Sequence, residues 1–146
     1  METRGGFLIS QIKQIQGRIF EKLLARSGVD AFNGAQGRIL YVLWQQDELP
    51  IVEVSRQTGL AKTTLTGMLD RLESQGLVVR SADPSDRRQI IIRLTEKAKQ
   101  LSESYARVSD EMTAIFYRGL SEDDIVRFES VLDHILVNLM ESESQK

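Results

Sequence analysis

The feature that most constrains the fold lies between residues 51 and 80, where two short helical patterns follow one another across a glycine. Ile51 and Val54 mark the first pattern, which the pair Thr58-Gly59 ends. The second pattern has apolar residues at three- and four-residue intervals and ends near Gly76: Leu65, Met68, Leu69 and Leu72. Two short helices joined by a glycine turn predict a helix-turn-helix.

The next stretch, residues 77–94, has the pattern of a β-hairpin. Residues 77–82 are strand-like, the sequence DPSDRR (83–88) supplies turn residues, and residues 89–94 alternate with Ile90, Ile92 and Leu94 on one face. An isolated two-stranded ribbon is marginal in water, so this hairpin is expected to pack on the preceding helices. A helix-turn-helix followed by a packed hairpin is a winged helix.

Longer helices flank this module on both sides. The expected helices run from about 7 to 27, from an Asn33 cap to about 46, from a Thr95 cap onward, and from a Ser121–Asp124 capping box onward, with Pro50 in the first turn of the helix at 51. Their apolar stripes exceed what the small winged module can cover, and a second copy of the chain would cover them. We therefore predict a mainly α (α+β) single domain, 1–146, in which 7–46 and 96–142 serve dimerisation and support and 50–95 is the winged helix-turn-helix.

The sequence lacks the residues that several classes of protein need for their function. The sequence contains no cysteine and one histidine, His134, to which we assign no role. Thiolate chemistry, paired-histidine metal sites and histidine-based triads are therefore absent, and no phosphate loop or dinucleotide motif is present. We expect no enzyme, no cofactor and no metal, and a hydrolase is disfavoured because no nucleophile is evident. The N-terminal residues form neither a secretory signal nor a membrane span, which favours a cytoplasmic location.

The helix from Lys62 to Gln75 has a polar face opposite its apolar stripe. At 100° per residue, Thr63, Thr66, Gly67 and Asp70 point away from Leu65, with Thr64 and Arg71 on the shoulder. Threonine hydroxyls and methyl groups can contact base edges in a major groove, and a helix amino end favours a phosphate. The predicted DNA contacts on this helix are Lys62, Thr63, Thr64, Thr66 and Arg71. The alternative is an ordinary solvated helix face.

The hairpin tip carries two adjacent arginines, Arg87 and Arg88, in a chain whose net charge is −2. Basic residues modestly outnumber acidic ones between 51 and 95, by 7 to 5, whereas the rest of the chain taken together has 12 basic and 16 acidic residues. A carboxylate at Asp70 would repel phosphates unless a cation held it. We therefore predict that one of the two arginines, Arg88 in preference to Arg87, pairs with Asp70 and ties the wing to the helix, while Arg87 stays free to enter a minor groove. Both Arg87 and Arg88 are counted among the predicted DNA-binding residues. The alternative is that both arginines are solvated turn residues.

The sequence resembles the MarR family of bacterial transcription regulators. The resemblance is carried by FNGAQGRILYVLW (32–44), TTLTGMLDRLESQGLVVR (63–80) and DPSDRRQIIIRLT (83–95), and with the flanking helices it covers nearly the whole chain. It implies a triangular homodimer that reads a palindromic operator, with Arg87 at the wing tip and Asp70 paired with Arg88. Two positions depart from the commoner pattern: Ala61, where many relatives have a serine cap, and Gly67, which is often basic.

The resemblance also implies a site for a small aromatic or phenolic effector between the dimerisation helices and the winged module. Arg18, Tyr41 and Trp44 could supply a cation and aromatic walls for a carboxylate. The alternative is that Tyr41 and Trp44 pack in the core and that Arg18 is a surface or interface charge. We expect a ligand-responsive repressor that binds double-stranded DNA as a homodimer. The competing hypothesis is a winged-helix protein-interaction module without sequence-specific DNA binding.

Overall fold

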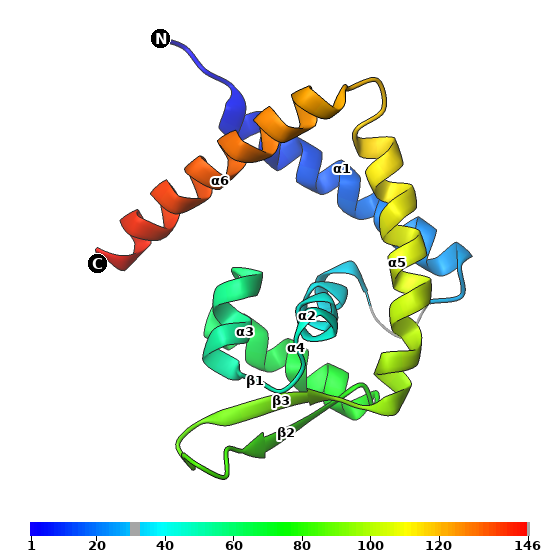
Figure 1. The fold of residues 1–146 in the computed structure, drawn as a ribbon, viewed down its shortest axis with the longest axis vertical. Coiled ribbons are helices and arrows are strands. Elements are labelled where there is room, and N and C mark those ends of the chain that lie inside the picture. Colours follow the sequence, from blue (N-terminus) through cyan, green and yellow to red (C-terminus); the bar gives the residue numbers. More distant parts are fainter. Residues whose placement is uncertain (30–32, 146) are drawn as a thin grey trace. The chain divides into compact units, whose positions relative to one another are not determined.

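A computed structural model describes residues 1–29 and 33–145 of the chain. The chain divides into two compact units, Met1–Met112 and Thr113–Lys146 (Figure 1). The elements in chain order are α1 (Gly5–Arg26), α2 (Gly34–Gln45), β1 (Leu49–Pro50), α3 (Ile51–Thr58), α4 (Lys62–Ser74), β2 (Val78–Ala82), β3 (Ile90–Leu94), α5 (Glu96–Phe116) and α6 (Glu122–Ser144). Positions 30–32 of the expected segment 7–46, Phe32 of the family motif among them, and position 146 lie outside the described residues.

The predicted helix-turn-helix is confirmed, and side-chain hydrogen bonds stabilise its turn. α3 ends where Gly59 adopts a left-handed φ of 74°, a conformation that glycine takes without a Cβ penalty. The buried Thr58 hydroxyl donates to the Val54 carbonyl oxygen at 2.7 Å and accepts from the Leu60 N–H at 3.2 Å. The Ser55 hydroxyl donates to the Leu60 carbonyl oxygen at 2.7 Å. These contacts fix where α4 begins.

The sheet has one strand more than the sequence pattern indicated. Its order is β1-β3-β2, fully antiparallel, with Ile92 of β3 paired to Leu49 on one side and to Arg80 on the other. β1 is only two residues long and contains Pro50, which suits an edge strand because proline cannot donate to a ladder. Pro50 was expected in the first turn of the following helix, and it instead pairs in β1 and directly precedes α3. A strand of two residues is too short to show the alternation of apolar and polar residues by which the other strands were predicted.

The core of the larger unit joins α2, α4 and the sheet. The fully buried side chains include three leucines of α4 that form its apolar stripe: Leu65, Leu69 and Leu72. Ile39, Leu40 and Leu43 of α2 and Ile92 of β3 are buried to the same degree. Burying one such side chain stabilises a fold by about 1.5–3 kcal/mol relative to leaving it exposed. The three leucines together therefore determine which face of α4 points outward.

The polar group of one core aromatic residue joins α2 to α5. The half-buried Trp44 donates from its indole Nε1 to the Ala98 carbonyl oxygen at 3.0 Å. Thr95 caps the start of α5, since its hydroxyl oxygen accepts from the Ala98 N–H at 3.3 Å, as predicted. The hairpin therefore leads directly into a helix that packs on α2.

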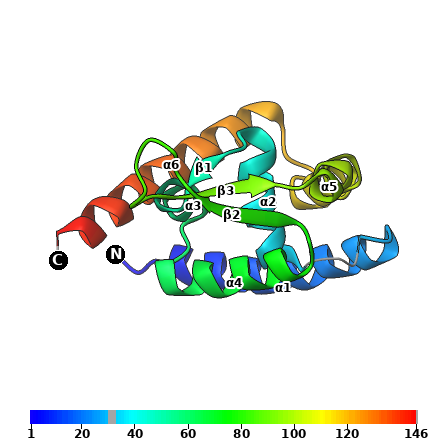
Figure 2. The ribbon, with the colours of Figure 1, turned by 90° about the horizontal axis from the view of Figure 1, so that it is seen from below.

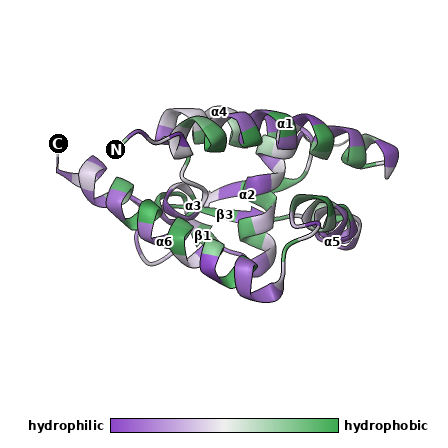
Figure 3. Cartoon of the chain, turned by 90° about the horizontal axis from the view of Figure 1, so that it is seen from above, coloured by the Kyte–Doolittle hydropathy of each residue, from purple (hydrophilic) through white to green (hydrophobic). Residues whose placement is uncertain are grey.

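The expected apolar stripes of the first and last helices lie largely open to solvent. On α1, four apolar side chains are exposed: Phe7, Ile9, Ile12 and Ile15. On α6 no residue is buried, and the exposed set is larger: Val126, Val131, Ile135, Leu136, Val137, Leu139 and Met140. Figure 3 shows hydrophobic patches along each of these helices. Exposed apolar patches of this length mark an interaction surface.

The smaller unit is organised by its aromatic residues. The rings of Phe116 and Tyr117 meet edge to face at 4.9 Å, and both contact the ring of Phe128 on α6. The Tyr117 hydroxyl donates to the Glu129 carboxylate at 2.6 Å. The predicted Ser121–Asp124 capping box is present at the start of α6. Across both units, none of the described helices is long and apolar enough to cross a membrane.

Two glycines of the helix-turn-helix, Gly59 in the turn and Gly67 within α4, should respond oppositely to alanine. Nothing lies within 4 Å of a Cβ at Gly67, so Gly67→Ala should raise the free energy of unfolding by about 1 kcal/mol through helix propensity. Gly59→Ala also meets open space, but its positive φ should cost about 1–2 kcal/mol. Chemical denaturation at one fixed protein concentration measures both values. A stabilising Gly59→Ala would contradict this account of the turn.

Candidate nucleic-acid interface

The outward face of α4 is polar, and its composition follows from the buried leucine stripe. Figure 2 shows α4 along one side of the β2–β3 hairpin. With Leu65, Leu69 and Leu72 turned inward, the residues predicted to contact DNA are all exposed: Lys62, Thr63, Thr64, Thr66 and Arg71. Short side chains cluster in the first two turns of the helix. This is the shape that allows a helix end to approach base edges in a major groove.

The start of α4 keeps backbone donors available. Its N-cap is Ala61, which has no side-chain oxygen to accept from the first-turn N–H groups, and its carbonyl accepts from the Leu65 N–H. Free N–H groups at a helix amino end attract an anion such as phosphate. The Thr66 hydroxyl donates to the Lys62 carbonyl oxygen at 2.8 Å. Thr66 therefore offers a base its methyl group and an acceptor oxygen.

The predicted ion pair between Asp70 and Arg88 is wrong for this structure, because Asp70 has a different partner. The guanidinium of Arg80 on β2 lies 2.6 Å from the Asp70 carboxylate and 2.9 Å from the Glu73 carboxylate. The Arg80 backbone N–H also donates to Glu73, at 3.1 Å. β2 leaves α4 through a short connection at Gly76, so Arg80 comes next to both acids. The sequence contained a signal for this contact, because the acids Asp70 and Glu73 and the base Arg80 lie on the two sides of the short connection at Gly76.

The cluster of Asp70, Glu73 and Arg80 compensates part of the negative charge on a face proposed to meet phosphates. The side-chain hydrogen bond from Arg80, and then its backbone hydrogen bond, lower the pKa of Glu73 below the usual 4.5. The same carboxylates, Glu73 first and then Asp70, raise the pKa of Arg80. Both acids are thus paired with one guanidinium. The Arg80 clamp, as we name these three residues, joins the helix to the hairpin.

The wing tip is built from two aspartate-centred turns. Asp83 accepts from the Ser85 N–H at 2.9 Å and from its hydroxyl at 2.8 Å, and these bonds, backbone first, lower the pKa of Asp83. Asp86 accepts from the Arg88 N–H at 3.1 Å, and its carboxylate also lies 3.2 Å from Arg88 Nε. Aspartate side chains commonly stabilise turns in this way. The pairing leaves the Arg88 side chain 92% exposed and local to the tip.

Arg87 lies beside this turn with its side chain exposed. Within residues 1–29 and 33–145, no carboxylate forms an ion pair with its guanidinium. The closed end of the hairpin extends beyond α4 (Figure 1). The structure thus presents an uncompensated cation at the wing tip. Its contact with DNA stays a prediction.

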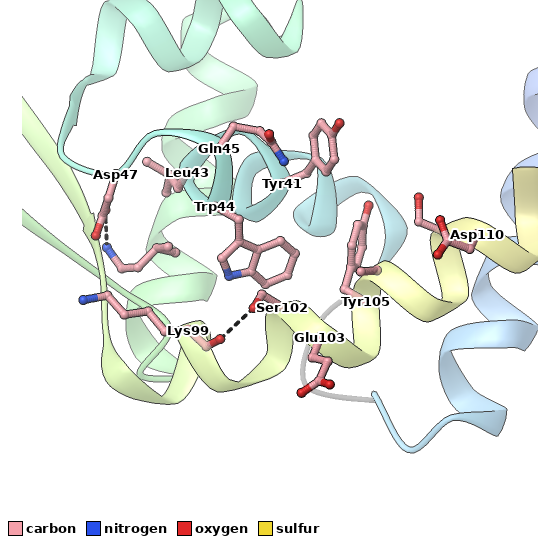
Figure 4. A pocket seen from close by; sticks show the side chains of 13 residues that line it. Tyr41, Leu43, Trp44, Gln45, Asp47, Lys99, Ser102, Glu103, Tyr105 and Asp110 are labelled. Atoms are coloured by element: carbon pink, nitrogen blue, oxygen red, sulfur yellow. Dashed lines mark hydrogen bonds between the residues drawn. The ribbon is translucent and has the colours of Figure 1, made fainter.

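A groove of about 680 Å³ lies between α2, the end of β3 and α5. In Figure 4 the rings of Tyr41, Trp44 and Tyr105 lie together in the middle, with Asp47 and Lys99 at one end and Asp110 at the other. The ring centroids of Trp44 and Tyr105 are 5.0 Å apart, and those of Tyr41 and Tyr105 are 6.5 Å apart. Burial raises the pKa of Tyr105.

The groove combines two of the three predicted effector residues. Tyr41 and Trp44 line it, whereas Arg18 of α1 is not among its described lining residues. Lys99 takes the place of the expected cation, and Tyr105 of α5 supplies a third ring. Residues far apart in sequence meet here because α5 packs on α2. Periodicity alone cannot indicate such a meeting.

The architecture defines the class: a helix-turn-helix with a packed β-hairpin is a winged-helix protein. Comparison with known proteins gives the family. The family model described as MarR family matches residues 32–90. The organic hydroperoxide resistance transcriptional regulator of Bacillus subtilis (strain 168) is 31% identical over 100 residues, covering 68% of this chain and 67% of the relative. The chain belongs to the MarR family.

A second curated relative and a solved structure extend the similarity over most of the chain. The HTH-type transcriptional repressor IacR of Pseudomonas putida is 28% identical over 131 residues, covering 88% of this chain and 77% of the relative. A mutant MarR from E. coli complexed with operator DNA superposes with a TM-score of 0.80 at 26% identity, covering 90% of this chain and 92% of that one. For two other curated relatives the match spans only 61% and 42% of the relative's length.

A double-mutant cycle separates the two possible partners of Asp70. Combining Asp70→Asn with Arg80→Met should give a free energy of unfolding that departs from the sum of the single effects, because both changes break the same contact. Combining Asp70→Asn with Arg88→Met should give additive effects. Urea denaturation of the variants measures both. Coupling to Arg88 and none to Arg80 would show that the free protein forms the other pair.

The Arg80 clamp should also contribute to the dependence of stability on pH. Because the pKa of Glu73 is lower in the folded chain than its usual 4.5, the contribution is present above about pH 4.5 and is lost as the pH falls through the folded-state value. Arg80→Met should return the pKa of Glu73 toward 4.5 and flatten this part of the acid limb. Carboxyl NMR titration measures the pKa directly. Arg107→Met, which alters an exposed arginine on α5, is the matched control and should change neither quantity.

Proposed function

We propose that this chain is a homodimeric transcription repressor that binds a pseudo-palindromic operator and whose DNA binding changes with a small-molecule effector. Each α4 would enter a major groove with its amino end, and each wing would place Arg87 in the adjacent minor groove. Such a protein acts on the chromosome, which agrees with a cytoplasmic location. Homologues of the chain are regulators rather than enzymes.

The observation that carries this proposal is the division of α4 into two faces. The leucine face is fully buried, so the helix cannot rotate to hide its polar face without exposing three large apolar side chains. What remains outside is a threonine-rich helix start that carries Lys62 and open backbone donors, with Gly67 at its centre and no exposed large apolar side chain. A surface of this kind has little capacity for apolar protein contacts. Its chemistry matches phosphates and base edges.

Dimerisation is supported by the exposed apolar residues of α1 and α6. A single chain leaves both rows in water, which a second copy would relieve. A two-fold dimer presents two α4 helices to successive major grooves, with half-sites about 34–36 Å apart along the duplex. The names of two similar proteins support the activity: the Pseudomonas putida relative is a repressor, and the E. coli neighbour was solved with operator DNA.

Arg87→Ala provides the direct test of the wing. DNA first selected by the chain from a random pool serves as the probe, and fluorescence anisotropy measures the dissociation constant at several salt concentrations. We expect weaker binding to all sequences and a shallower salt dependence, by about one unit of slope for each lost phosphate contact. Arg107→Ala removes an equal charge from α5 and should leave the affinity nearly unchanged. If Arg87→Ala and Arg107→Ala changed the affinity for DNA equally, Arg87 would not be a DNA contact.

Thr63→Val and Thr66→Val test base reading separately. Both keep the shape of the side chain and remove the hydroxyl, so they should change which sequences the random-pool selection returns rather than weaken all binding equally. Should the unaltered chain retain no DNA at low salt, the proposed function itself fails. A role as a protein-interaction module would then be favoured.

A further inference from the structure

Gly67 has no packing role within its own chain. It lies in the interior of α4, so its N–H and its carbonyl belong to the hydrogen-bond ladder of the helix. Its φ is not one of the positive values that four other described glycines adopt. In the described part of the chain, nothing outside the helix backbone and the two neighbouring residues lies within 4 Å of the place that a Cβ at Gly67 would take. Glycine destabilises a helix interior relative to alanine, whereas the close approach of another molecule is a physical reason for it.

The side chains one turn away leave the backbone at Gly67 uncovered. Thr63 and Asp70 lie on the same face of α4, four residues before and three residues after the glycine, and both are exposed. The Asp70 carboxylate is held at the hairpin by the Arg80 guanidinium, at 2.6 Å, rather than across the glycine. The Thr66 hydroxyl donates to a carbonyl oxygen of its own helix at 2.8 Å, which fixes the Thr66 methyl group beside Gly67. The outward face of α4 thus has a bare patch of backbone at Gly67, between two threonines and a tethered carboxylate.

The charged side chains that follow Gly67 balance one another. The carboxylates of Asp70 and Glu73 carry two negative charges, and the guanidinium groups of Arg71 and Arg80 carry two positive charges. A phosphate is therefore not attracted to this part of α4 as it is to the helix start with its open backbone donors. The backbone groups of Gly67 are committed to the helix, so they offer no hydrogen bond to a polar base edge. The group that fits the bare patch is neutral and apolar.

We propose that Gly67 is a specificity-determining residue that admits the C5-methyl group of a thymine in the major groove. This methyl group is the apolar group that a base pair presents there, and threonine methyl groups are suited to contact it. Thr63 and Thr66 supply such methyl groups on either side of the bare patch. A Cβ at residue 67 would occupy the space that the thymine methyl group needs. The inference rests on the proposed function, because it names a base that α4 reads.

Uracil tests the proposal because it differs from thymine only by the missing C5-methyl group. The probe is the duplex that the unaltered chain selects from a random pool, with its thymines replaced by uracil one position at a time, and fluorescence anisotropy measures each dissociation constant. We expect one position in each half-site at which uracil weakens binding about three- to fivefold, as the loss of one buried methyl group does. Replacement in both half-sites should weaken binding about tenfold or more. If no thymine of the selected duplex responded to its replacement by uracil, the proposal would be overturned.

Gly67→Ala links the responsive thymine to the glycine. The added methyl group competes with the thymine methyl group for one space, so this variant should bind the selected duplex at least about tenfold more weakly. Its preference for thymine over uracil at the responsive position should be lost or reversed, whereas thymines that contact only Thr63 or Thr66 should respond alike in both proteins. Misfolding does not explain such a result, because the same substitution is expected to stabilise the fold, and denaturation of the same samples checks this. An equal preference for thymine in the two proteins would overturn the role of Gly67.

A second selection, with Gly67→Ala in place of the unaltered chain, measures whether the sequence read by α4 changes. We expect sites in which the responsive position is no longer fixed as thymine, while the positions next to the wing stay the same. Identical sites from both proteins would refute the specificity role and leave the proposed function standing, because DNA is still bound. An unaltered chain that retains no DNA at low salt would overturn both.

Discussion

The burial of Leu65, Leu69 and Leu72 sets the rotation of α4, and the whole nucleic-acid interface depends on that rotation. Successive residues of a helix differ by 100°, so the inward direction of these leucines dictates the outward direction of Thr63, Thr66 and Gly67. The turn before the helix reinforces this setting, because Thr58 and Gly59 fix the point where it starts. Apolar packing on one face of α4 thus positions polar chemistry on the other.

Ion pairs then change the charge of the outward face of α4 that the packing of the leucines leaves exposed. The leucine stripe leaves Asp70 on the outward face, where a bare carboxylate would oppose a phosphate backbone. The Arg80 guanidinium pairs with that carboxylate and with Glu73, so it compensates one of their two negative charges, and it does so within the hairpin base rather than at the wing tip. Arg88 pairs with Asp86 in its own turn, so the tip does not depend on α4 for its shape. Arg87 is consequently available without any rearrangement of the clamp.

The groove between α2 and α5 lies next to the base of the β2–β3 hairpin. Trp44 anchors α2 to the start of α5 through the Ala98 carbonyl, and Asp47 binds the backbone of Leu94 at the end of β3. These two hydrogen bonds meet where the hairpin enters α5. The contacts of α2 with β3 and α5 are therefore contiguous with the base of the wing.

The local patterns of the sequence determined the helices, their caps and the hairpin. Leucine spacing, the Thr58-Gly59 turn, the Ser121–Asp124 box and the alternation after residue 89 depend on contacts between near neighbours, and the structure contains all of them. Tertiary structure decided which arginine pairs with Asp70, and it alone decided the third strand at Leu49 and the contact of Trp44 with Tyr105. Each of these joins segments whose distance in space is set by packing. The charge of a residue and its place in a periodic pattern indicate which contacts it could form. The path of the chain in space decides which of those contacts are formed.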